Sequence, residues 1–86
     1  MSRESLTKVR DEFRQAFQEY LEEGDRMAEL LRRGGDDIND ELRTAIREQQ
    51  VVLTSALERY EKARRLYVET VMGQLAGLSA MALGLH

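Results

Sequence analysis

Apolar residues in the first third of the chain recur at alternating intervals of three and four. Two positions of a seven-residue repeat are apolar, and they hold Leu6, Phe13, Tyr20 and Met27 in one series and Val9, Ala16 and Leu30 in the other. This spacing lines one face of an α-helix. Glu23 interrupts the second series. The pattern predicts a helix over about residues 3–33.

A turn is predicted directly after this helix. Arg32 and Arg33 suit a last helical turn, because cations stabilise the negative end of the helix dipole. Gly34 and Gly35 follow, and glycine adopts the left-handed conformation that closes a helix at no steric cost. The carboxylates of Asp36 and Asp37 are then expected to cap a second helix that begins at about residue 37.

The second helix is expected to run over about residues 37–83, and it repeats the seven-residue pattern. One series holds Ile46, Leu53, Tyr60 and Tyr67, and the other holds Leu42, Gln49, Ala56 and Ala63. The pattern leaves open whether the helix breaks near Gly73 or Gly77. Further apolar residues widen the stripe beyond what a two-stranded seam would cover. We therefore expect residues 1–86 to form one all-α domain, a long antiparallel two-helix hairpin that assembles into a four-helix or larger bundle.

The turn position also predicts which residues lie at the same level. If the chain reverses at Gly34-Gly35, opposed residues have numbers that sum to about 70. This register would bring Phe13 and Phe17 near Ala56 and Leu53, so that large side chains face small ones. It would also place Glu23 near Gln49. These residues form either a polar layer that fixes the register or two separate interruptions at the edge of the stripe.

The C-terminal segment differs from the rest of the chain. The second helix should outrun the first from about Val68, and residues 70–85 contain no ionisable side chain. A helix that is apolar around most of its circumference is normally buried. We therefore predict that residues 71–86 are an interaction segment. Its expected interface residues are Val71, Met72, Leu75, Leu78, Met81, Ala82, Leu83 and Leu85.

Composition narrows the classes of function. The 86 residues include no proline to kink a helix and no cysteine, which excludes disulfides and thiolate metal sites. The net charge is −3; residues 21–50 carry nine acidic and five basic side chains, a local charge of −4. No dense basic stripe is present, so nucleic acid is not an expected partner. Because so small a domain buries a limited share of its surface, association is expected.

Catalytic chemistry is difficult to assemble from this sequence. The single histidine, His86, is the last residue, and no Glu-x-x-His pair typical of di-iron bundles occurs. We predict no catalytic residue, no cofactor and no metal site, and therefore no enzyme. Tyr60 and Tyr67 lie seven apart; they are either boundary residues with buried rings and solvated hydroxyls, or a platform for a ligand or a partner.

Three functions are compatible with the sequence. The first is a helical interaction module that forms a homo-oligomer, most simply a dimer, or pairs with another helical protein. The second is a membrane-associated protein anchored by residues 66–85, which Glu69, Gln74 and three glycines disfavour. The third is a small secretion substrate or chaperone, although the Trp-x-Gly turn common in such substrates is absent. The charged first eight residues lack the apolar stretch of a secretory signal, so a cytoplasmic location is expected.

Overall fold

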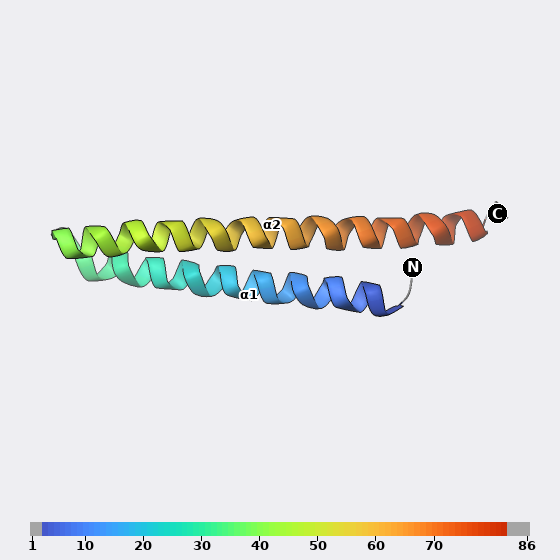
Figure 1. Ribbon diagram of the computed structural model, residues 1–86, viewed down its shortest axis with the longest axis horizontal. Helices are drawn as coiled ribbons and strands as arrows, with labels where there is room; N and C mark the ends of the chain where they lie inside the picture. Colours follow the sequence, from blue (N-terminus) through green and yellow to red (C-terminus); the bar gives the residue numbers. More distant parts are fainter. Residues whose placement is uncertain (1–2, 83–86) are drawn as a thin grey trace.

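The computed structural model describes residues 3–82 and consists of two long helices joined by a short turn. Helix α1 spans Arg3–Gly34 and helix α2 spans Asp40–Ala82, and they run antiparallel (Figure 1). The predicted all-α hairpin is therefore confirmed. The molecule measures 67 × 19 × 15 Å, and its radius of gyration is 19.7 Å. A compact domain of this length would have a radius of gyration of about 12 Å.

The end of α1 follows the predicted chemistry. Gly35 has a φ of 51° and so adopts the left-handed conformation expected after the last helical turn. The amide of Asp37 donates to the carbonyl of Gly34 at 2.9 Å. Gly34 is also required for packing, because a Cβ at this position would lie 2.7 Å from a side-chain methyl of Leu42.

The start of α2 differs from the prediction. The helix begins at Asp40 instead of residue 37, and its cap is Asn39 instead of Asp36 or Asp37. The Oδ1 atom of Asn39 accepts a hydrogen bond from the amide of Leu42 at 2.8 Å. The carbonyl of Asn39 accepts the first helical bond, from the amide of Arg43. The chain uses residues 35–39 to cross from one helix to the other, and only Asn39 stands where the free amides of α2 begin.

Once started, α2 continues without a break through Gly73 and Gly77 to Ala82. The open question of an interruption there is resolved in favour of one helix. Residue 83, the predicted end of the helix, lies outside the described residues.

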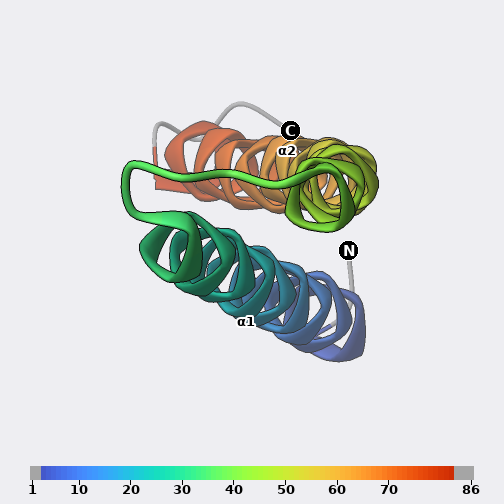
Figure 2. The same cartoon turned by 90° about the vertical axis from the view of Figure 1, so that its left-hand side faces the viewer.

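The seam between the helices is narrow and is defined by its buried residues. Ala16 and Glu23 on α1 and Ala56 and Thr70 on α2 are spaced by seven or fourteen along each helix, and Gly34 is buried at the turn end. Gln49 contacts Glu23 across the seam. Opposed residues on the seam therefore have numbers that sum to about 72. The predicted register is displaced by about two residues, because the turn is longer than a Gly-Gly reversal. Seen end-on, each helix has one neighbour (Figure 2).

Aromatic rings from the two helices pack on one another beside the seam. The ring of Phe13 lies 5.7 Å from that of Tyr60 and 5.4 Å from that of Tyr67, so that rings pack on rings. The rings of Tyr20 and Tyr60 are stacked 5.7 Å apart. Alanines on the seam let the helix backbones approach, and the aromatic rings then fill the space beside the seam.

Candidate functional site: the apolar side of the hairpin

The hairpin has two unlike sides, one on each flank of the seam. Glu19 and Arg59 each lie three residues after a buried alanine, and they form an ion pair with a separation of 3.7 Å. In an antiparallel pair of right-handed helices, residues with equal offsets from the seam lie on the same side. On α1 this line continues with Arg26 and Arg33, whereas on α2 the residues at the same offset from the seam, other than Arg59, include Ala45, Val52 and Leu66. We call this flank the polar side.

Residues one or four positions after the seam lie on the opposite flank. This flank is mainly apolar on α1, whereas on α2 its outer line alternates apolar residues with Arg43, Gln50 and Arg64. Those four positions after the seam include the aromatic residues Phe13, Tyr20, Tyr60 and Tyr67. Phe17 follows Ala16 and Leu57 follows Ala56, and both lie farther out on the same flank. We call this flank the apolar side.

A second apolar line of α1 borders the apolar side. It alternates steps of four and three residues through Phe17, Leu21, Gly24, Ala28 and Leu31. None of these residues is buried. The spacing is that of a coiled-coil seam without a partner helix. This line was not predicted as a separate surface. The signal that identifies it is its 4-3-4-3 spacing, which is present in the sequence.

The hairpin by itself has almost no apolar core. Among the described residues, the buried apolar side chains are only those of Ala16 and Ala56. Large apolar side chains that are at least 40% exposed are Phe17, Leu21, Leu31, Ile38, Val51, Val52, Leu66, Val68, Met72 and Leu75. Phe17, Leu21 and Leu31 form one line on α1, whereas Val52 and Leu66 lie on the polar side. Single exposed apolar residues are normal, but so many of them on a chain without a core indicate an interaction surface.

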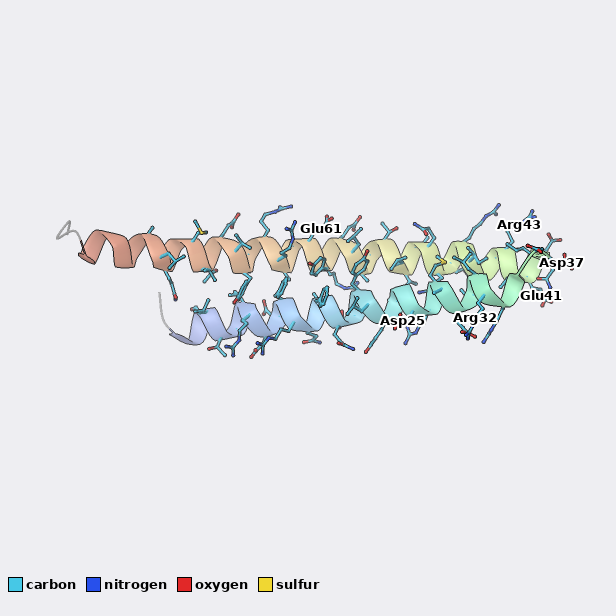
Figure 3. All side chains as sticks on the ribbon, turned by 180° about the vertical axis from the view of Figure 1, so that it is seen from behind. Asp25, Arg32, Asp37, Glu41, Arg43 and Glu61 are labelled. Carbon is cyan, nitrogen blue, oxygen red and sulfur yellow. The ribbon has the colours of Figure 1, made fainter. Side chains whose placement is uncertain are left out.

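Three arginines interrupt the apolar side, namely Arg43 and the pair Arg10 and Arg64, which lie at one level. Arg10 lies on the α1 line that includes Phe17, and Arg64 lies on the α2 line that includes Leu57. The Nε of Arg10 is 3.6 Å from a carboxylate oxygen of Asp11. Other charged residues point outward: Asp25 and Arg32 extend from the outer edge of α1, and Glu61 extends from that of α2 (Figure 3).

Compared with known protein families, curated proteins and solved structures, the chain matches none of them.

The seam contains one polar contact. The amide nitrogen of Gln49 donates to the carbonyl oxygen of Glu23 and to its carboxylate Oε2, both at 2.9 Å. Arg26 binds the other carboxylate oxygen of Glu23. Glu23 is 8% exposed, so its charge is satisfied inside the seam. The predicted contact between the two interruptions is confirmed, and the alternative of two separate edge residues is excluded.

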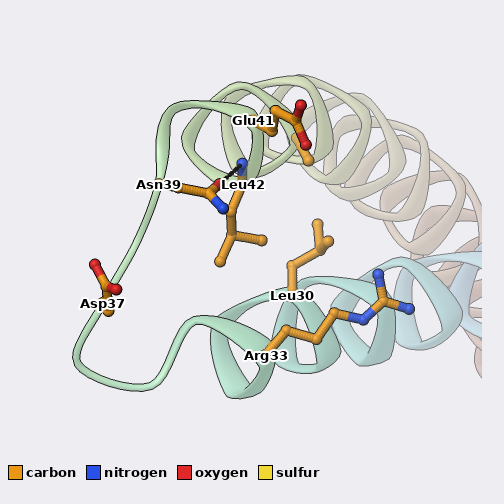
Figure 4. Close-up of a pocket in the computed structure, with 7 residues that line it drawn as sticks. Leu30, Arg33, Asp37, Asn39, Glu41 and Leu42 are labelled. Atoms are coloured by element: carbon orange, nitrogen blue, oxygen red, sulfur yellow. Dashed lines mark hydrogen bonds between the residues drawn. The ribbon is translucent and has the colours of Figure 1, made fainter.

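The turn end contains an open pocket of about 350 Å³. Leu30 and Leu42 face each other in it, and Arg33, Glu41 and the capping Asn39 surround them (Figure 4). Because Arg33 belongs to the polar line of α1, the pocket opens toward the polar side. Its polar groups are those of the helix ends, and they do not converge on a common point.

The described residues contain neither a metal-binding cluster nor a membrane-spanning stretch. Over residues 3–82, no group of three or more acidic or histidine side chains is arranged to hold a metal ion. Neither helix, over the same residues, includes a stretch of sufficient length and hydropathy to span a lipid bilayer.

The predicted interface segment follows the last residue buried in the seam, Thr70. Val71 is half-buried, whereas Met72 and Leu75 are exposed. Leu78, Met81 and Ala82 belong to α2, but their side chains are outside the described part; Leu83, Leu85 and His86 lie outside the described residues. The end of α2 extends past the start of α1 in Figure 1.

Tyr60 and Tyr67 are boundary residues, as one of the two interpretations expected. Both are partly exposed, and their rings pack against Phe13. They belong to the apolar side.

Proposed function

We propose that the protein is a non-enzymatic helical assembly module, which forms a homo-oligomer or pairs with another helical protein through its apolar side and its C-terminal segment. One observation carries the proposal: among the described residues, the only buried apolar side chains are two alanines. Hydrophobic burial supplies most of the free energy that opposes chain entropy, and two alanines bury little area. A partner helix supplies the missing apolar contacts.

The C-terminal segment supports the same function. Met72 and Leu75 follow the end of the seam and are exposed, and no ionisable residue occurs between Glu69 and His86. Helices of this kind are stable when other helices cover them.

Light scattering coupled to size-exclusion chromatography tests the proposal on the full chain and on a truncation after Thr70. We expect the full chain to elute as an oligomer and the truncation to associate more weakly. A full-length monomer that unfolds cooperatively would contradict the proposal, because the hairpin would then be stable without a partner. A full-length monomer that unfolds without cooperativity would indicate that the partner is a different helical protein.

A further inference from the structure

We infer that the apolar side binds a second copy of this chain, and that the two hairpins pack antiparallel about a two-fold axis at the level of Leu57. This inference rests on the proposed function and specifies its partner and geometry. Three observations support it: the excess surface of the hairpin, the distribution of charge along it, and the symmetry of the apolar side.

The exposed surface is of the size that a stable dimer buries. The chain exposes 6926 Å². A compact monomer of the same mass would expose about 5,200 Å², so each chain has an excess of about 1,700 Å². Two chains that bury this excess form an interface of about 3,400 Å², which is within the range of obligate homodimers.

The charge distribution opposes a parallel dimer. Two parallel hairpins would place their turn ends side by side, and residues 21–50 of each copy carry a charge of −4. They would also bring Arg10 and Arg64 of both copies to one level on the shared face. Like charges held at close range across an interface are unfavourable. An antiparallel dimer separates the turn ends by most of the length of the molecule.

The apolar side is self-complementary about Leu57. The α2 line on this side is Arg43, Gln50, Leu57, Arg64 and Val71. When it pairs antiparallel with its copy, opposed residues have numbers that sum to about 114. Leu57 then meets Leu57 of the second copy, Arg64 meets the neutral Gln50, and Val71 meets the stem of Arg43.

The facing lines of α1 agree with the same axis. By the register of the seam, Leu57 lies level with about residue 15 of α1, midway between Phe13 and Phe17. The two rings therefore exchange places across the axis, and Phe13 of each copy faces Phe17 of the other. Arg10 comes level with Tyr20 of the second copy, where a guanidinium can stack on an aromatic ring.

The C-terminal overhang is covered in the same arrangement. Leu75 lies beyond the reach of α1 of its own chain. In the antiparallel dimer it is level with residues 38–40 of the second copy, and Met72 is level with residues 41–43. Leu31 and Ile38, which are exposed at the turn end, lie in this region. The apolar tail of one copy thus covers the apolar turn end of the other.

Cysteine cross-linking tests the geometry without background, because the natural chain has no cysteine. We expect Leu57→Cys to form a disulfide-linked dimer by itself. Arg43→Cys and Val71→Cys should cross-link to each other when the two variants are mixed, and neither should cross-link when alone. Contact in the dimer raises the effective thiol concentration from micromolar to millimolar, so these disulfides should form on the order of 1,000-fold faster than random ones.

Ser55→Cys is the matched control, because Ser55 lies near the same level on the opposite flank of α2 and is also partly buried. It should not cross-link. Circular dichroism of each reduced variant shows that the helices are intact before oxidation.

The outcomes separate this inference from the proposed function. A dimer in which Val71→Cys or Ser55→Cys cross-links with itself, or in which none of the variants cross-links, would overturn the antiparallel geometry but leave the assembly function intact. A full-length chain that is monomeric and lacks cooperative unfolding would overturn the second copy as partner. A cooperatively folded monomer would overturn both.

Discussion

At the scale of single residues, the most specific contact in the hairpin is the one between Gln49 and Glu23. One amide group satisfies a carboxylate oxygen and a main-chain carbonyl, both at 2.9 Å. A glutamine displaced by one position along α2 would point about 100° away from Glu23. The contact therefore selects one register among several that the alternation of apolar residues permits. Buried polar pairs in coiled coils act in the same way, at some cost in stability.

Replacement of this glutamine gives the first prediction. Gln49→Ala removes both hydrogen bonds and leaves the carboxylate of Glu23 in the seam with Arg26 as its remaining partner. We expect the free energy of unfolding to fall by about 1–3 kcal/mol, as is typical when a buried charged group loses a hydrogen-bond partner. Urea denaturation followed by circular dichroism measures the change.

An exposed glutamine on the outer face of α1 is the control. The side-chain amide of Gln18 donates to the carboxylate of Glu22 at 3.2 Å within the same helix. Gln18→Ala should change the free energy of unfolding by less than about 0.5 kcal/mol. Equal effects of the two substitutions would show that the contact across the seam does not contribute to stability.

At the scale of the helices, the two ends of the turn are built differently. Helix α1 ends through backbone conformation, with Gly35 in the left-handed region. Helix α2 begins through a side chain, with Asn39 accepting the amide of Leu42. Gly35 ends α1 and Asn39 begins α2. The number of residues between the two helices therefore sets the register of the whole hairpin.

The cap of α2 gives the second prediction. Asn39→Ala removes the acceptor for the Leu42 amide and should lower the free energy of unfolding by about 1 kcal/mol, whereas Asn39→Asp should retain most of the stability. Asp37→Ala, two residues earlier, should have little effect, because the carboxylate of Asp37 does not cap the helix. Thermal melts at fixed protein concentration compare the three variants. If Asp37→Ala lowered the free energy of unfolding more than Asn39→Ala, Asp37 would be the cap, as the sequence predicted.

The end of α1 gives the third prediction. Gly35→Ala meets no neighbouring atom within 4 Å, so its only cost is the positive φ of 51°. This conformation costs a residue with a Cβ about 1–2 kcal/mol. Gly35→Asn should lose less, since asparagine tolerates the left-handed region better. An alanine variant as stable as the natural chain in urea titration would show that the turn readily adopts another path.

These helix ends also show which features could be predicted from the sequence. The bounds of α1 and the closing glycines depend on neighbours along the chain, and they were predicted to within one residue. The start of α2 was not, because Asp36, Asp37 and Asn39 are all good caps. The path of the chain between the two helices determines which of the three residues caps α2. That choice lengthened the turn and displaced the register by about two residues. The Glu23–Gln49 contact remained predictable because the displacement is small compared with the reach of a glutamine.

At the scale of the whole molecule, the proposed association depends on the contrast between the two sides of the hairpin. Phe17 and Val52 are almost equally exposed, at 40% and 43%, but they lie on the apolar side and the polar side respectively. The expected interface residues at the C-terminus were chosen for being apolar. The line from Phe17 to Leu31 was overlooked because it seemed part of the stripe that faces α2. Only the positions of the buried residues separate that line from the seam.

Association through the apolar side makes thermal stability depend on protein concentration. Folding of a dimer is coupled to association, so each tenfold dilution reduces the free energy of unfolding by about 1.4 kcal/mol per dimer. For two chains of this length, the melting temperature should fall by about 3–5 °C per tenfold dilution. Melts followed by circular dichroism over three decades of concentration measure this slope. Phe17→Glu places a charge on the apolar side and should abolish the slope, since a buried unpaired carboxylate opposes association. Val52→Glu, a charge of equal exposure on the polar side, should preserve it. A melting temperature independent of concentration in the natural chain, or a slope lost only in Val52→Glu, would place the interface elsewhere.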